Sequence, residues 1–189
     1  MNKPCGYVCS AVSDSHKTVY ELLPPELISL VQGAKRGSRL HTIGRLDADT
    51  SGLLLFTTDG YFSHRIAANP EISKTYFATL VKPVEEKHQK EYIERASNGL
   101  TLPPEKKFGE QKCEPAKLTF LSKEMCEVTI HEGKFHEVRR IFRALGNEVE
   151  ELKRIAIGEL MLPADLNPGQ WRYLNEEEKA SLCSHQQDY

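Results

Sequence analysis

Residues 44–60, GRLDADTSGLLLFTTDG, constrain the fold of this chain more than any other stretch. Residues 53–56 are a short apolar run of the kind that forms a strand buried on both faces, and Asp59-Gly60 is a turn pair that can also cap a following helix. The pattern predicts a loop, a buried strand and a turn, in that order. Asp47 lies on the loop between two glycines, and a carboxylate held on an anchored loop is a candidate catalytic group.

The composition is typical of a globular chain. With 189 residues, of which 39% are hydrophobic, the chain can bury an ordinary core. No apolar run approaches the roughly 20 residues that span a bilayer, and the start of the chain lacks an apolar signal core. Five cysteines at irregular spacing favour reduced thiols over a disulfide framework. We therefore expect a cytoplasmic protein with no membrane contact.

The net charge and its distribution point in different directions. A formal net charge of -2 is unusual for an RNA-binding protein, because phosphate contacts come from clustered lysines and arginines. The basic residues gather in two places while the acidic ones are concentrated elsewhere, which fits one basic face with acidic flanks. Taken alone, the charge pattern favours an ordinary solvated surface over an RNA-binding face. The two basic clusters are Lys35, Arg36, Arg39 and Arg45, and Lys134, Arg139, Arg140 and Arg143.

Local patterns in the first half of the chain predict helices and one clear strand. Helices are expected over residues 16–31, with a break at Pro24-Pro25, over 61–68, where Asp59 is the N-cap, and over 84–96, with Ile93 and Ala96 inward. Residues 33–37 predict a basic loop. The alternation over 74–81 predicts a strand with Tyr76 on one of its faces.

The second half predicts further strands and two helices. Residues 101–115 form a polar connection, either a mobile RNA-facing loop or a long surface excursion. Residues 117–121 and 125–131 predict a hairpin, 135–145 a helix with its arginines largely off the apolar stripe, and 150–157 and 159–162 strands. Asn175 and Glu178 predict a capping box for a short terminal helix. The alternation of strands and helices along the chain predicts one α+β domain built around a mixed, largely antiparallel sheet.

Four segments together resemble one family. Residues 44–60 match every specified position of GRLD-x-x-T-x-GLLL-x-T-x-DG, a motif of the RsuA/RluB family of pseudouridine synthases, which isomerise uridine in ribosomal RNA. Residues 2–10, 74–76 (KTY) and 132–162 resemble the same family in the same order. The last segment is similar to EGK-x-HQVRRM...G...R-x-x-IG, with Glu137 replacing Gln and Ile141 replacing Met. Neither change touches a group expected to do chemistry, although Glu137 adds a negative charge near the expected RNA site.

The resemblance implies the pseudouridine synthase fold, a long bent sheet flanked by helices with an RNA-binding cleft across its middle. Many members carry an S4-like RNA-binding domain ahead of the catalytic domain, whereas this chain starts almost directly at the NKP segment of residues 2–4. We therefore expect a single catalytic domain over residues 1–189 without an S4 domain, with weaker and less selective RNA binding as a result. We also expect a monomer.

The resemblance also implies the chemistry. Pseudouridine formation breaks the N-glycosidic bond, turns the uracil and rejoins it through carbon, so it needs no cofactor and no metal. It does need a carboxylate, as a nucleophile toward the ribose or as the partner of an oxocarbenium-like centre. The resemblance assigns this role to Asp47, with Arg139 as its ion-pair partner. Tyr76 would stack on the target base and help remove the proton from carbon.

The target uridine must leave its stack, at a cost of a few kcal/mol, before it can be turned over. Aromatic stacking and phosphate contacts have to offset that cost. A second candidate for the ion pair with Asp47 is Arg45. By resemblance, Arg45 could instead hold open the base stack of the RNA after the uridine has left it. The spacing of the histidines in HEGKFHE is not HExxH, so we expect no metal site there. The expected RNA contacts are Arg45, Lys74, Lys134, His136, Arg140 and Arg143.

The first hypothesis is therefore a site-specific ribosomal RNA pseudouridine synthase. The start NKPxGYVCS is most similar to the RsuA type, which acts on small-subunit (16S) RNA. Three alternatives stay open: an enzyme of the same family acting on 23S RNA, a non-catalytic RNA-binding or ribosome-assembly protein, and a hydrolase that uses Asp47 and Asp49 as paired carboxylates.

Overall fold

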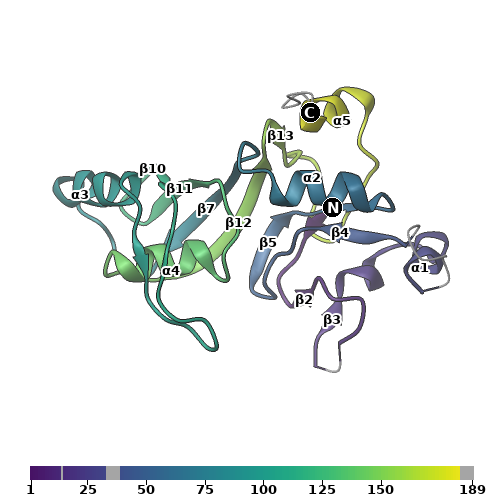
Figure 1. The fold of residues 1–189 in the computed structure, drawn as a ribbon, viewed down its shortest axis with the longest axis horizontal. Coiled ribbons are helices and arrows are strands. Elements are labelled where there is room, and N and C mark those ends of the chain that lie inside the picture. The colour runs from purple at the N-terminus through teal and green to yellow at the C-terminus, as the bar shows by residue number, and fades with distance from the viewer. Residues whose placement is uncertain (14, 33–38, 184–189) are drawn as a thin grey trace. The chain divides into compact units, whose positions relative to one another are not determined.

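The computed structural model describes residues 1–13, 15–32 and 39–183, which belong to two compact units. The first unit comprises Met1–Ile72 and Arg154–Tyr189, and the second comprises Ser73–Lys153. The boundary falls inside strand β12 (Val149–Ile157), so this strand contributes residues to both units. Figure 1 shows the elements of each unit along the chain.

The main sheet of the first unit places the N-terminal strand beside the strand that follows the Asp47 loop. β1 (Asn2–Lys3) pairs antiparallel with β5 (Thr50–Leu53), which neighbours β12, and β13 (Leu160–Met161) pairs with the end of β12. Two small sheets complete the unit. β2 (Tyr7–Val8) and β3 (Lys17–Thr18) are parallel, and β4 (His41–Ile43) and β6 (Leu55–Thr57) are antiparallel.

The apolar run at residues 53–56 forms parts of two strands, not the single strand that its pattern predicts. Between β5 and β6, the Leu54 N–H donates to the Met1 carbonyl at 2.9 Å, and the Met1 ammonium donates to the Leu54 carbonyl at 3.0 Å. The backbone therefore changes partners here, from β1 to β4. Burial follows the prediction, since Leu53, Leu54 and Leu55 are all buried.

Two helices of the first unit, α2 and α5, begin where their caps predict. Asp59 accepts hydrogen bonds from the N–H groups of Tyr61 and Phe62 at the start of α2 (Gly60–Ala68). The side chains and N–H groups of Asn175 and Glu178 bond reciprocally, at 2.8 and 2.9 Å, before α5 (Glu176–Cys183). One hydrophobic cluster in the core of this unit is made by Ile43, Leu53, Leu55, Ile66, Ile72, Ile157, Leu160 and Leu182.

The helix predicted over residues 16–31 is shorter than expected and has two parts. A 3₁₀ turn, η1 (Val19–Leu22), precedes α1 (Pro25–Gln32), and β3 occupies the start of the predicted range. The break falls at Pro24-Pro25 as predicted, because a proline cannot supply an N–H to the preceding turn. The predicted basic loop at 33–37, with Lys35 and Arg36, lies outside the described residues.

The second unit is an antiparallel sheet of order β12-β7-β11-β10, covered by helices. β7 (Lys74–Leu80) pairs with β11 (Met125–Ile130), which forms the predicted hairpin with β10 (Lys117–Phe120). Burial along β7 alternates as predicted, with Tyr76, Ala78 and Leu80 inside. The antiparallel main sheet and the small parallel pair together confirm the predicted mixed α+β class.

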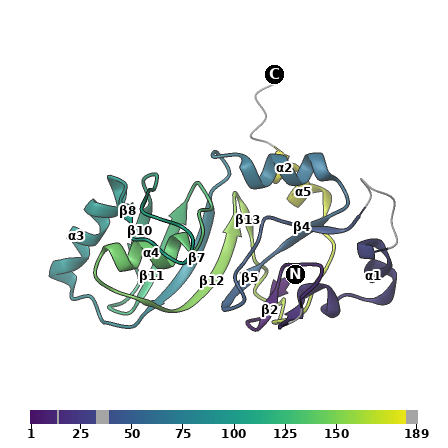
Figure 2. The ribbon, with the colours of Figure 1, turned by 60° about the horizontal axis from the view of Figure 1, so that its bottom comes forward.

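Helix α3 (Glu86–Ser97) packs on β10, where Tyr92 meets Phe120 edge to face with ring centroids 6.1 Å apart. Figure 2 shows this helix beside the strand. The prediction for Ala96 is confirmed, since it is buried, but that for Ile93 is wrong, because 38% of this residue is exposed. No helix among the described residues is long and apolar enough to cross a membrane.

The polar connection at residues 101–115 contains a hairpin that its composition does not reveal. β8 (Thr101–Leu102) pairs antiparallel with β9 (Gln111–Lys112), and Glu105 forms a β-bridge with Phe108 near the tip. The hairpin lies next to α4 (Glu137–Ala144). It is therefore an ordered element.

Candidate active site

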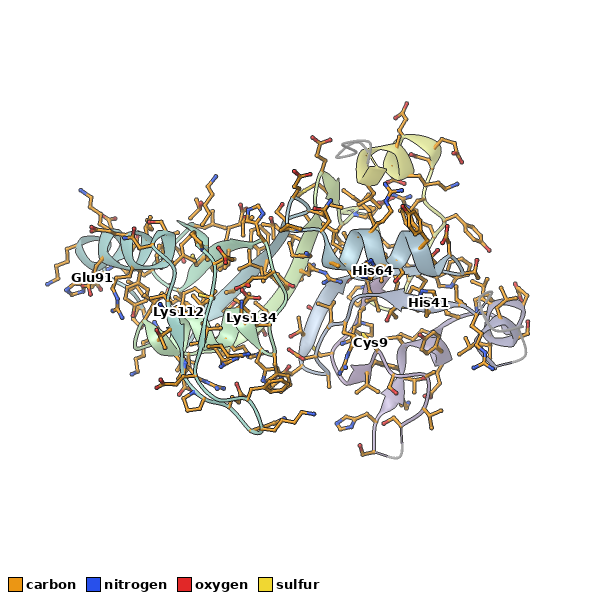
Figure 3. The ribbon with its side chains drawn as sticks, viewed as in Figure 1. Cys9, His41, His64, Glu91, Lys112 and Lys134 are labelled. Carbon is orange, nitrogen blue, oxygen red and sulfur yellow. The ribbon has the colours of Figure 1, made fainter. Side chains whose placement is uncertain are left out.

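Asp47 is half-buried on the loop between β4 and β5, and the N-terminal segment anchors this loop. The Thr50 N–H donates to the Asp47 carbonyl at 3.1 Å, which closes a turn, and the Gly6 N–H donates to the Ala48 carbonyl at 2.7 Å. The thiol of Cys9, labelled in Figure 3, donates to the Leu46 carbonyl at 3.4 Å and accepts from the Leu46 N–H at 3.3 Å. The backbone on both sides of Asp47 is thus held in place.

Lys3 is the strongest anchor of the Asp47 loop, and sequence reasoning missed it. Its side chain is fully buried. The ammonium donates to the carbonyls of Asp47 at 2.9 Å, Thr50 at 2.7 Å, Pro4 at 3.1 Å and Ala48 at 3.4 Å. Burial lowers the pKa of Lys3, and the nearby carboxylates of Asp47 and Asp49 are among the groups that oppose this shift. The signal was available, because Lys3 belongs to the NKP segment that matches the family.

The glycine at position 52 is required by a close approach of two strands. Its φ is +106°, and a Cβ atom there would lie 2.1 Å from the Arg154 carbonyl oxygen. The buried Arg154 in turn donates from Nε to the Leu53 carbonyl at 2.8 Å. Gly52 and Arg154 are both motif positions, and together they hold β5 against β12 at the end of the Asp47 loop.

Tyr76 and Lys74 share the buried face of β7 in the second unit. Each is 8% exposed, and Tyr76 stands opposite Val128 on β11. Because alternate residues of a strand point to the same side, the side chains of Lys74 and Tyr76 project from the same face of the sheet. Lys74 is therefore beside the candidate stacking residue and not on an open outer surface.

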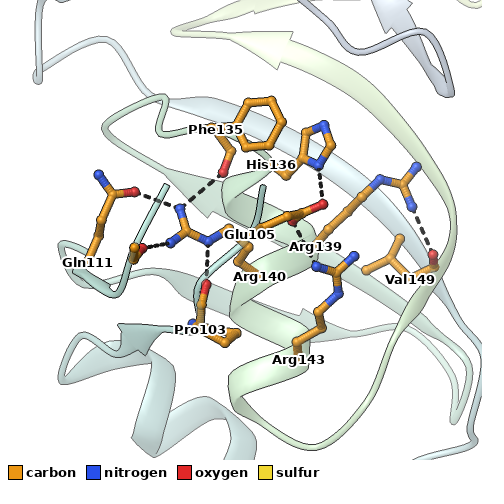
Figure 4. Close-up of polar contacts among 10 residues, drawn as sticks. Pro103, Glu105, Gln111, Phe135, His136, Arg139, Arg140, Arg143 and Val149 are labelled. Atoms are coloured by element: carbon orange, nitrogen blue, oxygen red, sulfur yellow. Dashed lines mark hydrogen bonds and ion pairs between the residues drawn. The ribbon is translucent and has the colours of Figure 1, made fainter. Parts of the chain in front are cut away.

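Helix α4 carries the three arginines, and their burial differs from the prediction. Arg139 is 9% exposed and Arg140 is fully buried, although the sequence places both off the apolar stripe. Nη1 of Arg139 donates to the Val149 carbonyl at 2.9 Å, whereas Nη1 of Arg143 forms a 2.8 Å ion pair with Glu105 (Figure 4). In these two contacts, Arg139 and Arg143 donate to different acceptors.

Arg140 joins α4 to the β8–β9 hairpin. Its Nε donates to the Pro103 carbonyl at 2.9 Å, Nη2 to the Gly109 carbonyl at 2.9 Å, and Nη1 to Gln111 Oε1 at 2.7 Å (Figure 4). A fourth acceptor is the carbonyl of Phe135, in the segment before α4, 3.3 Å from Nη1. The fork of guanidinium donors suits such a ring of acceptors. The structure does not support Arg140 as an RNA contact, because its donors all point into the protein.

The segment before α4 brings stacked aromatic rings and a half-buried hydrogen bond together. The rings of Phe135 and His136 stack with centroids 3.8 Å apart, and those of Phe108 and Phe135 stack at 4.7 Å. His136 Nδ1 donates to Glu105 Oε1 at 2.9 Å. Burial alone would raise the pKa of Glu105, but the hydrogen bonds and charges of His136 and Arg143 outweigh it and lower this pKa. Glu105 is therefore ionised and bridges the hairpin to α4.

The predicted site residues divide between the two units. Asp47 and the exposed Arg45 belong to the first unit, whereas the others described above belong to the second. Lys134, labelled in Figure 3, also lies in the second unit and forms an ion pair with Glu132. Arg39, the remaining described member of the first basic cluster, is exposed.

The described cysteines form no disulfide. Cys5, Cys9, Cys113 and Cys126 are free thiols, and burial raises the pKa of Cys126 to about 12. Within the described ranges, no group of three or more His, Cys, Asp or Glu side chains could hold a metal ion.

The comparisons with known proteins decide the family. The family model for RNA pseudouridylate synthases matches residues 1–144. The chain belongs to this family. It is similar to ribosomal small subunit pseudouridine synthase A of Escherichia coli strain K12, with 41% identity over 183 residues that cover 96% of this chain and 72% of that protein. The protein of the same name from Vibrio cholerae has the same identity and coverage.

A solved pseudouridylate synthase structure confirms the predicted fold. It aligns with a TM-score of 0.81 and 40% sequence identity, covering 96% of this chain and 71% of that chain. The predicted family is confirmed by both kinds of comparison, and the protein is a pseudouridine synthase, an isomerase.

Proposed function

We propose that this pseudouridine synthase converts uridine to pseudouridine in small-subunit ribosomal RNA. The observation that carries the proposal is the 41% identity, over 96% of the chain, to relatives named as small-subunit enzymes. The motif residues lie in a suitable local setting: Asp47 on an anchored loop, Tyr76 on the buried face of a strand and Arg139 in a buried helix. The family motifs that these residues match assign them as the reacting group, the stacking group and the partner of the carboxylate.

The reaction places a distinct demand on each of these three residues. The bond between uracil N1 and the ribose breaks, the uracil turns, and its carbon 5 bonds to the same ribose carbon. N1 takes up a proton and carbon 5 releases one, so the atoms balance without a co-reactant. Asp47 would stabilise or attack the electron-poor sugar, and the family motif makes the cationic Arg139 its charge partner. Tyr76 would hold the base by stacking and assist the loss of the proton.

Tritium release tests this proposal. RNA labelled with tritium at carbon 5 of uracil should lose its label when a 16S transcript is the substrate, and nucleoside analysis should show pseudouridine. Release from a 23S transcript alone would contradict the small-subunit assignment. Free uracil or cleaved strands would instead support the hydrolase alternative, and no release from either RNA would support a binding protein. The same assay on assembling particles shows which form of the RNA is used.

We propose that the tip of the β8–β9 hairpin contacts the RNA. Lys106 and Lys107 are exposed there, and each ammonium lies over an aromatic ring, 5.5 Å from the Phe135 centroid and 5.6 Å from the Phe108 centroid respectively. Lysines beside aromatic faces are suited to the phosphates and bases of unpaired RNA. Lys134, His136 and Arg143 lie in the same unit, and Arg45 is our proposed contact in the first unit.

Replacing both Lys106 and Lys107 by Ala should reduce the salt dependence of RNA binding. Each lost phosphate contact on single-stranded RNA lowers the slope of log affinity against log salt by about 0.7, so we expect a change of about 1.4. Binding titrations between low and moderate salt measure it. The matched control replaces Lys87 and Lys90, two exposed lysines of α3. An equal change in both double variants would contradict a specific contact at the hairpin.

A further inference from the structure

The side chain of Glu137 closes the turn that leads into α4. Glu137 is the first residue of the helix and only 4% exposed. The Lys134 N–H donates to Glu137 Oε2 at 2.8 Å, and the Glu137 N–H donates to the Lys134 carbonyl at 3.1 Å. These two bonds tie the turn to the helix, two residues before Arg139. The conformation of the turn is unusual, since His136 has a φ of 48°.

The Glu137 carboxyl group also bonds to a second carboxyl group, that of Glu132. Glu132 accepts from the Glu114 N–H at 2.8 Å and forms an ion pair with the Lys134 ammonium. Two carboxyl groups can form a hydrogen bond only if one of them carries a proton. Glu132, which is less buried and paired with a cation, is the ionised member. Glu137 is therefore the donor.

The electrostatics agree with this assignment of the proton. Burial raises the pKa of Glu137 to about 7, and the charge of Glu132 adds to the shift, while the Lys134 N–H and ammonium oppose it. For Glu132, burial acts to raise the pKa, but the Lys134 and Glu114 contacts outweigh it and lower the pKa. The buried Cys113 thiol, from the segment after β9, also faces Glu137, whose charge adds to the effect of burial in raising the pKa of this thiol.

We propose that Glu137 is a positioning residue that works as a protonated acid, holding the turn of residues 132–136 against α4 and thereby fixing Arg139. This inference rests on the role proposed for Arg139. When Glu137 loses its proton to solvent, the bond to Glu132 is lost and two carboxylates face each other away from water. One of them must move toward solvent, and the first turn of α4 loosens. The activity of the enzyme then falls as pH rises.

Glutamine stands at this position in the family motif that the chain resembles, and the same geometry explains why. A Gln side chain accepts from the Lys134 N–H with its carbonyl oxygen and donates to Glu132 with its amide group. It makes both bonds at every pH. Glu137 makes them only while it is protonated, so the exchange of Gln for Glu converts a permanent contact into one that depends on pH.

The variant E137Q tests the proposal through the pH profile of single-turnover tritium release. For one group with a pKa of about 7, the protonated fraction falls about eight-fold between pH 6.5 and 8. We expect that decline in the parent enzyme and less than about a two-fold change in E137Q. The control E110Q removes an exposed carboxylate of the hairpin and should keep the parent profile. Parallel profiles for the parent and E137Q would overturn the proposal.

A carboxyl NMR titration of the parent protein tests the same point without a variant. The Glu137 carboxyl resonance should titrate near neutral pH, and a midpoint below pH 5 would overturn the proposal. The two measurements also separate this inference from the proposed function. No tritium release by any variant at any pH would reject the proposed function, whereas full release with identical pH profiles would reject only the role of Glu137.

Discussion

Replacing Asp47 with Asn should slow uridine isomerisation by at least about a thousand-fold, a loss of the size seen when a reacting group is removed. The amide keeps the shape of the side chain but has no negative charge, so it can neither attack the sugar nor stabilise positive charge on it. The loop should stay in place, because its anchors are backbone carbonyls and the Lys3 ammonium. RNA affinity should therefore stay within about two-fold of the parent.

Single-turnover tritium release and an RNA titration, made on the same preparation, measure the two effects. The matched control is Asp49→Asn, which removes an exposed carboxylate from the same loop. It should retain most of the activity, because we assign Asp49 to the turn and not to the chemistry. Full release by Asp47→Asn would reject the mechanism, and an equal loss in both variants would point to paired carboxylates.

Replacing Lys3 with Met should lower the free energy of unfolding by about 3 to 5 kcal/mol, because several buried carbonyls lose a donor and each such loss costs roughly 1 to 3 kcal/mol. Methionine fills most of the space of the lysine stem but takes the ammonium donor away from the carbonyls of Asp47 and Thr50. The turn should then relax. We expect the rate to fall about a hundred-fold at a temperature where the variant is still folded, because small displacements of a reacting group have effects of that size.

Urea unfolding gives the free energy, and single-turnover release below the unfolding temperature gives the rate. Lys17→Met is the control, since Lys17 is an exposed lysine on β3 of the same unit. Its free energy of unfolding should change by no more than about 0.5 kcal/mol. A Lys3→Met variant with parent stability and parent rate would show that the four carbonyl contacts do not support the loop.

Much of the fold followed from local patterns. The cap at Asp59, the alternation along β7, the β10–β11 hairpin and the capping box before α5 are each set by residues within a few positions of one another. Local signals of this kind depend on hydrogen-bonding side chains and periodicity, which are visible in a sequence. The failed prediction for the arginines of α4 concerns residues whose partners lie far away in the chain.

The arginines of α4 illustrate the limit of prediction from local sequence patterns. Their spacing off the apolar stripe indicates a solvated face, because a charged side chain is seldom buried without partners. The acceptors that allow Arg140 to be buried come from a hairpin 29 to 37 positions earlier in the chain. That hairpin has a polar composition and was not recognisable as an element. Sequence reasoning therefore assigned Arg140 to RNA, when the structure places it inside the protein.

The sequence by itself determined the family, the position of Asp47 on a loop before a buried run, and the chemistry that the motifs imply. Only the tertiary structure decided how that loop is held and how the proton of Glu137 is retained. Lys3 reaches the carbonyls of residues 47–50 because β1 pairs with β5, a contact that joins positions about fifty residues apart. Pairing between distant segments leaves no local periodicity, so these roles became visible only when the chain was folded.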